Sequence, residues 1–173
     1  MDTLLFKEIQ RFRSPWGWLI VIGLNLLFAW AFVQQIIFDK PWGSNPASNF
    51  VLVLISLIPI GILILFLTVR FETGINENGI YYMFFPFHFK RHLIDWKNVD
   101  KAFIREYNPI SEYGGWGIRF WFGYGNAYNI SGNKGIQLEF KNGKRLLFGT
   151  QKPKDIEEVL QQLTYKKIIN QSS

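Results

Sequence analysis

The chain has 173 residues, no cysteine and a formal net charge of +6 at pH 7. The lack of cysteine excludes disulfides, a thiolate nucleophile and zinc sites built on sulfur. The positive charge favours an anionic partner, and membrane lipid and nucleic acid both meet that condition. Charged residues are absent from 14–38 and from 41–69, so we expect the two halves of the chain to lie in different solvents.

The first segment, residues 1–15, carries apolar side chains at helical spacing and charged ones on the opposite side. The apolar residues are Leu4, Leu5, Ile9 and Phe12. A helix of this kind buries one face in the headgroup region of a bilayer. We therefore predict a short interfacial helix that lies along the membrane.

Two long apolar segments follow, at residues 16–38 and 50–69. A membrane-spanning helix needs about 20 mostly apolar residues to cross about 30 Å of hydrocarbon. Sixteen of the twenty residues in 50–69 are Phe, Val, Leu or Ile. We predict a transmembrane helical hairpin over residues 16–70, in which Asn25 forms a hydrogen bond with the partner helix.

The basic residues around these segments are unevenly placed. Lys7, Arg11 and Arg13 precede the first span, whereas the link between the spans has only Lys40. Because Lys and Arg accumulate on the cytoplasmic side of membrane proteins, both termini are predicted to be cytoplasmic. The chain is therefore expected to be a multi-pass protein of the inner (plasma) membrane.

Residues 71–173 show the pattern of short strands and tight turns. Asn78-Gly79 and Asn142-Gly143 each lie between apolar runs, which is typical of β-hairpins. Residues 153–168 predict a closing amphipathic helix, whose apolar stripe is Ile156, Val159, Leu160 and Leu163. The predicted fold class is α+β: an antiparallel β-sandwich or small barrel capped by a C-terminal helix.

Four stretches together resemble bacterial membrane-anchored PH-like proteins. They lie within residues 71–165 and are INENGIYY, LIDWKNVDKAFIREY, GGWGIR and LEFKNGKRLLFGTQKPKDIEEVL. The resemblance implies a PH-like domain that binds lipids, peptides or proteins, or that assembles. The short acidic loop NENG stands where phosphoinositide-binding members carry a basic cluster, so inositol-phosphate binding is not carried over.

The polar side chains do not form a catalytic pattern. The two histidines, His88 and His92, are four residues apart in a predicted strand, which separates them by about 13 Å. A metal pair is not expected at that separation, and the sequence has no nucleophile elbow, Walker loop or paired acid site. We expect a protein that is not an enzyme and that binds no metal or cofactor.

The stretch GGWGIRFWFGYGNAYNISG, residues 114–132, is rich in glycine and aromatic residues. It lacks the third glycine of G-x-G-x-x-G, and we interpret it as a strand, a turn and a second strand packed in the sheet. Alternatively, Trp116, Arg119 and Trp121 contact the membrane interface or a partner. Nucleic-acid binding is not expected, because no RNP-like pattern is present in this tethered chain.

A second candidate contact is the basic cluster HFKRH, in which Lys90 and Arg91 follow the second span. The stretch FHFKRHLIDW, residues 87–96, alternates well enough to predict a strand. Its cations either bind anionic headgroups, at about 1 kcal/mol per charge near the surface, or are solvated residues of that strand.

The function expected from the sequence is a non-enzymatic membrane protein whose PH-like domain serves as a binding or scaffold module. Its expected ligand is anionic lipid or a protein partner, which includes a second copy of the chain. The alternative is an accessory subunit of a membrane transport or export assembly, with the helical hairpin packed against other spans.

Overall fold

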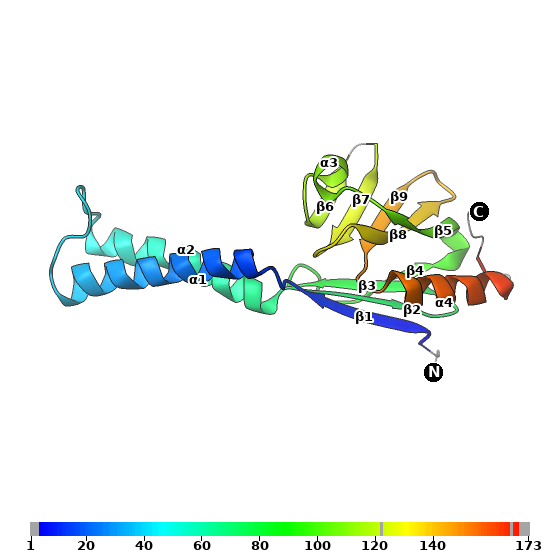
Figure 1. The fold of residues 1–173 in the computed structure, drawn as a ribbon, viewed down its shortest axis with the longest axis horizontal. Coiled ribbons are helices and arrows are strands. Elements are labelled where there is room, and N and C mark those ends of the chain that lie inside the picture. The colour runs from blue at the N-terminus through cyan, green and yellow to red at the C-terminus, as the bar shows by residue number, and fades with distance from the viewer. Residues whose placement is uncertain (1–3, 122, 167, 170–173) are drawn as a thin grey trace. The chain divides into compact units, whose positions relative to one another are not determined.

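The computed structural model describes residues 4–121, 123–166 and 168–169, and of Trp121 it describes only the backbone. The chain divides into two compact units. The helical unit is Arg13–Val69, and the β domain is assembled from the segments before and after it (Figure 1). The β domain is therefore discontinuous in sequence.

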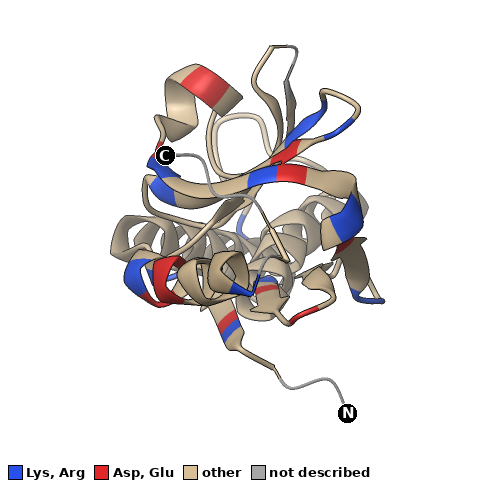
Figure 2. Cartoon of the chain, turned by 90° about the vertical axis from the view of Figure 1, so that its right-hand side faces the viewer, with Lys and Arg blue, Asp and Glu red and all other residues tan. Residues whose placement is uncertain are grey.

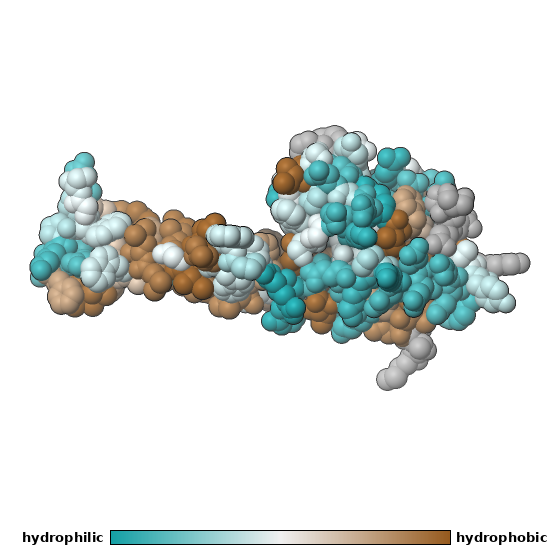
Figure 3. Space-filling view, in the orientation of Figure 1, coloured by the Kyte–Doolittle hydropathy of each residue, from teal (hydrophilic) through white to brown (hydrophobic). Residues whose placement is uncertain are grey.

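The helical unit contains two helices joined by a loop. Helix α1 is Pro15–Phe32 and continues as a π-helical turn, η1, at Val33–Ile37, and α2 is Asn49–Thr68. Ser14 and Ser48 cap the two N-termini by accepting hydrogen bonds from backbone amides. The two segments have 23 and 20 residues and are long and apolar enough to cross a membrane. Figure 3 shows their apolar surface. The structure confirms that both predicted segments are helices.

Sheet A of the β domain has four antiparallel strands in the order β1-β2-β3-β4. These strands are β1 Phe6–Arg11, β2 Arg70–Ile75, β3 Gly79–Phe85 and β4 His92–Asp95. Strand β1 pairs with β2 along its whole length (Figure 1). The helical unit is thus inserted, in sequence, between two adjacent strands.

The interfacial helix predicted for the first residues is wrong, because they form β1. Alternate side chains of β1 are buried, among them Glu8 and Gln10. Glu8 accepts hydrogen bonds from Thr150 Oγ1 at 2.6 Å and from Gln151 N at 2.9 Å. Gln10 Nε2 donates to Gly149 O at 2.7 Å. These distant partners determine the strand, and the local spacing of apolar residues does not reveal them.

Sheet B has five strands in the order β5-β8-β9-β7-β6. They are β5 Val99–Glu106, β6 Gly117–Trp121, β7 Gly125–Asn129, β8 Lys134–Phe140 and β9 Arg145–Gly149. The prediction of a purely antiparallel domain is wrong, because β7 runs parallel to β9. The hairpin β6–β7 lies between β5 and β8 in sequence and adds to the free edge of β9. The described strands form two open sheets and no closed barrel.

Aromatic rings fill the space between the sheets. The ring of Phe71 in sheet A lies 5.8 Å from that of Phe148 and 6.3 Å from that of Tyr128, both in sheet B. Helix α4, Pro153–Tyr165, buries the predicted stripe of Ile156, Val159, Leu160 and Leu163. Acidic and basic residues lie side by side on its outer surface (Figure 2). The α+β class and the closing helix are confirmed.

The connections between strands are short. Both predicted Asn-Gly turns are confirmed, since they join β2 to β3 and β8 to β9. Two short helices that the sequence analysis did not predict, η2 (Trp96–Asn98) and α3 (Pro109–Tyr113), lie between β4 and β5 and between β5 and β6.

Candidate functional site

The connection between β3 and β4, residues 86–91, lies at the end of sheet A that is joined to both helices. Phe85, the last residue of β3, is opposite Arg70, and Arg70 is opposite Arg11. In the chain, Arg70 comes directly after the C-cap of α2, and Arg11 comes shortly before the N-cap of α1. This connection, called the β3–β4 loop, therefore shares its end of the sheet with both links to the helical unit.

The β3–β4 loop and the strand after it expose large apolar side chains. Phe87 is 59% exposed, Phe89 80% and Leu93 61%. The ring centroid of Phe87 lies 6.1 Å from that of Phe84, and that of Phe89 lies 5.9 Å from that of Phe85. The sheet therefore holds the two loop rings in place while most of their surface remains uncovered. Aromatic rings beside cations are typical of segments that enter the headgroup region of a bilayer.

The strand predicted for residues 87–96 is wrong in its first half. Strand β3 ends at Phe85, and pairing with β4 resumes only at His92, which lies opposite Tyr82. The alternation of aromatic and basic residues therefore belongs to a loop. The sequence analysis missed the exposed rings Phe87 and Phe89 for this reason, although Pro86 gave the signal that β3 stops before them.

The two cations of the loop have different surroundings. Arg91 donates to Glu72 Oε1 at 2.7 Å, and its guanidinium lies 5.2 Å from the centre of the Tyr81 ring. Lys7 also approaches Glu72, at 3.4 Å, and Glu72 is 4% exposed. Lys90 is exposed and forms no ion pair with the residues that the structure describes. Arg91 thus links the loop to the sheet, and Lys90 is the loop cation that remains available to contact an anionic ligand.

His88 and His92 lie close together, so the expected separation of about 13 Å is wrong. Their ring centroids are 4.8 Å apart, because His88 lies in the loop and not in a strand. The ring of Tyr82 contacts both, and that of Tyr128 contacts His88. Burial, and secondly the neighbouring His92, lower the pKa of His88 below its usual value, which favours the neutral form of its ring. In the described part of the chain, no group of three or more His, Cys, Asp or Glu could hold a metal ion.

The other contact residues predicted from the sequence belong to sheet B and the segment before it. Trp116 is 41% exposed, and its Nε1 donates to Gly132 O at 3.0 Å. Arg119 Nε donates to Trp116 O at 3.0 Å. The structure therefore brings these two residues together, and it places Lys90 and Arg91 apart from them, in the β3–β4 loop of sheet A. The side chain of Trp121 lies outside the described residues.

Asn25 links the two helices of the helical unit. Its Nδ2 donates to Pro59 O of α2 at 3.1 Å and to Val21 O of α1 at 2.8 Å. Next to the loop that joins the two helices, Gln35 Nε2 donates to Ala47 O at 2.6 Å and to Asn49 Oδ1 at 2.9 Å. These polar groups are used within the hairpin.

No protein-family model and no curated protein matches the chain. The fold and the site define its class as an α+β protein with two helices of membrane-spanning length and a two-sheet β domain. The function must therefore be argued from the geometry of this chain.

Proposed function

We propose that the chain is a multi-pass protein of the inner membrane whose β domain is a non-enzymatic binding module that docks on anionic lipid. The observation that carries this proposal is the exposed β3–β4 loop, with Phe87, Phe89 and Lys90, at the helix-joined end of sheet A. Full burial of one Phe contributes about 1.5–3 kcal/mol, and one Lys adds about 1 kcal/mol at an anionic surface. Two rings and one cation are enough to hold a loop that the chain already tethers to the helices.

The pairing of β1 with β2 supports two complete membrane crossings. Strand β1 precedes α1 and β2 follows α2, yet the two strands are neighbours in one sheet. Strands of one sheet must lie on the same side of a membrane, and an even number of crossings meets this condition. The basic residues before α1 favour the cytoplasmic side for both termini.

We further infer that the β domain is PH-like. The hairpin β2–β3, the hairpin β8–β9 and the closing helix α4 follow the order that the resemblance implies. The remaining stretch of the resemblance, GGWGIR, leads from α3 into β6. Glu77 of the turn between β2 and β3 forms an ion pair with Lys166. We therefore do not propose this turn as a binding site for an anionic ligand.

Docking of the loop can be tested with the full-length chain in lipid nanodiscs. Because the chain has no cysteine, Phe89→Cys provides a single site for an environment-sensitive fluorophore. We expect blue-shifted emission and quenching by spin-labelled lipid in discs that contain anionic lipid. The matched control is Lys97→Cys, an exposed site just beyond Asp95 at the other end of sheet A, roughly 17–20 Å away. Equal quenching at both sites, or none at position 89, contradicts the proposal.

A second function, as an accessory subunit of a transport or export assembly, is favoured by one feature of the helical unit. A cavity of about 500 Å³ lies between α1 and α2 and is lined mainly by apolar side chains around Asn25 and Pro59. A side chain of another membrane helix would fill it. Crosslinking in native membranes separates the two functions. Crosslinks to another membrane protein that disappear in Ala29→Phe, which fills the cavity, support the assembly.

A further inference from the structure

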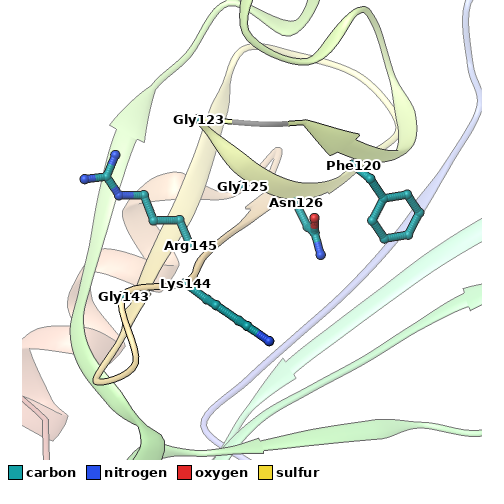
Figure 4. Close-up of a pocket in the computed structure, with 7 residues that line it drawn as sticks. All are labelled: Phe120, Gly123, Gly125, Asn126, Gly143, Lys144 and Arg145. Atoms are coloured by element: carbon teal, nitrogen blue, oxygen red, sulfur yellow. The ribbon is translucent and has the colours of Figure 1, made fainter.

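A second cavity, of about 640 Å³, lies in the β domain where two turns of sheet B meet (Figure 4). Because β7 and β9 are adjacent and parallel, the turn before β7 and the turn before β9 lie at the same end of the sheet. Gly125 permits this approach, since a Cβ there would lie 2.3 Å from Arg145 O. The glycine-rich stretch that the sequence assigns to packing therefore also forms a cavity wall.

The cavity combines an aromatic ring, a carboxamide and a cation. Figure 4 shows Phe120, Asn126 and Lys144 extending to the same side of the sheet, whereas Arg145 extends to the other side. Phe120 is 68% exposed, and Asn126 and Lys144 are exposed as well. Arg145 pairs with Glu139 at 3.5 Å. Lys144 forms no ion pair with the described residues, and none of those that line the cavity is Asp or Glu.

The cavity lies beside the β3–β4 loop. Asn126 and Tyr128 are two residues apart on β7, which is about 7 Å along a strand, and they share one face of the sheet. The ring of Tyr128 contacts Phe71 of sheet A and His88 of the β3–β4 loop. The face of sheet B that packs on sheet A therefore continues outward into the cavity, next to the loop that we propose docks on lipid.

We propose that this cavity binds the phosphate ester of a small polar headgroup. The phosphate lies at Lys144 Nζ. The hydroxyl groups of the ligand form hydrogen bonds with the Asn126 carboxamide, and its carbon skeleton covers the Phe120 ring. A Lys ammonium binds phosphate as a point charge, a carboxamide both donates and accepts hydrogen bonds, and ligand cavities commonly measure about 300–1,000 Å³. The lipid form of this ligand, phosphatidylglycerol, rests on the proposed docking at the membrane. Glycerol 3-phosphate offers the same chemistry in solution.

The test titrates the full-length chain, in uncharged detergent, with short-chain phosphatidylglycerol and separately with glycerol 3-phosphate, followed by calorimetry. We expect Lys144→Gln to weaken binding about tenfold, which is the loss of one charge-assisted hydrogen bond. Lys141→Gln is the matched control, because Lys141 lies in the same turn but lines another cavity, with Glu77 and Asp95. It should bind like the unmodified chain.

Each outcome of this titration decides a separate point. If Lys144→Gln weakens binding of the lipid alone, the ligand is a headgroup, and if it weakens binding of glycerol 3-phosphate alone, the ligand is a soluble ester. Weakening for both supports a site for the ester group itself. No binding of either probe, or equal losses in Lys141→Gln and Lys144→Gln, overturns the inference. Docking is measured separately, by the quenching of the fluorophore at position 89 by spin-labelled lipid. Lys144→Gln should not change this quenching.

Discussion

The two ends of sheet A differ in how far their aromatic side chains are buried. At the end away from the helix connections, Trp96 is 4% exposed, and its Nε1 donates to Asn76 O at 2.9 Å. At the helix-joined end, Phe87 and Phe89 remain mostly uncovered. The same strands run between the two ends, so the contrast comes from what lies beyond each. The aromatic ring at one end is covered by the protein itself, whereas the rings at the other end form the exposed apolar surface on which the proposed docking rests.

The largest expected effect is a loss of stability when the buried ring of Trp96 is removed. Replacing Trp96→Ala removes a buried ring and a hydrogen bond, and truncation of a core aromatic residue costs about 3–5 kcal/mol. We expect a correspondingly lower free energy of unfolding, measured by near-UV circular dichroism in detergent. A loss below about 1 kcal/mol would mean that this end is not held by Trp96.

The next effect concerns the ion pairs that hold the exposed end. In Glu72→Gln the buried carboxylate no longer balances Arg91 and Lys7, and we expect a loss of about 1–3 kcal/mol in the free energy of unfolding. The control is Glu77→Gln at the other end, whose ion pair with Lys166 is about half exposed and is worth about 0–1 kcal/mol. Equal losses in the two variants would contradict the different roles assigned to these carboxylates.

A smaller effect on stability, with a clear effect on docking, is expected at the loop. Phe89→Ser should change the free energy of unfolding by less than about 0.5 kcal/mol, because the ring is mostly exposed. A fluorophore at Phe87→Cys should nevertheless lose its quenching by spin-labelled lipid in nanodiscs. Tyr165→Ser is the control, since Tyr165 is 90% exposed on α4 and should leave the quenching unchanged. Equal quenching at position 87 in Phe89→Ser and Tyr165→Ser would contradict docking through Phe89.

The smallest effect is a dependence on pH. The pKa of His88 is lowered in the folded chain from 6.5, so the unfolded chain binds the proton more readily. Its contribution to stability is therefore complete above about pH 6.5 and is lost as the pH falls through the lowered folded pKa. Thermal unfolding between pH 7 and pH 5 should show a smaller decline in His88→Gln than in the unmodified chain. An identical decline in both would exclude this contribution.

The parts of the fold that the sequence predicts are those determined by local pattern. Two apolar runs without charges predict α1 and α2, Asn-Gly pairs predict two hairpins, and a stripe with a period of 3.6 residues predicts the buried face of α4. Each of these signals lies within about twenty residues of chain. No knowledge of a distant partner is needed to interpret them.

The parts that the sequence analysis missed depend on partners far along the chain. Glu8 and Gln10 become buried residues of a strand only because Thr150, Gln151 and Gly149 satisfy their polar groups. The parallel pairing of β7 with β9 likewise has no local signal in the sequence. Because the cavity at Lys144 depends on this pairing, the sequence does not predict the cavity either. A soluble fragment that starts at residue 72 would lack β1, so binding experiments require the full chain.

The insertion of both helices between β1 and β2 also has a consequence for biosynthesis. Strand β1 is made first, but its partner β2 emerges only after the whole helical hairpin has been synthesised. Until then the buried face of β1, with Phe6, Glu8 and Gln10, has nothing to pair with. Completion of sheet A thus requires that the two ends of the hairpin meet, which the proposed topology satisfies by two crossings of the bilayer. Under the proposed topology, a chain with only one of its two helices inserted would leave β1 and β2 on opposite sides of the bilayer and could not complete sheet A.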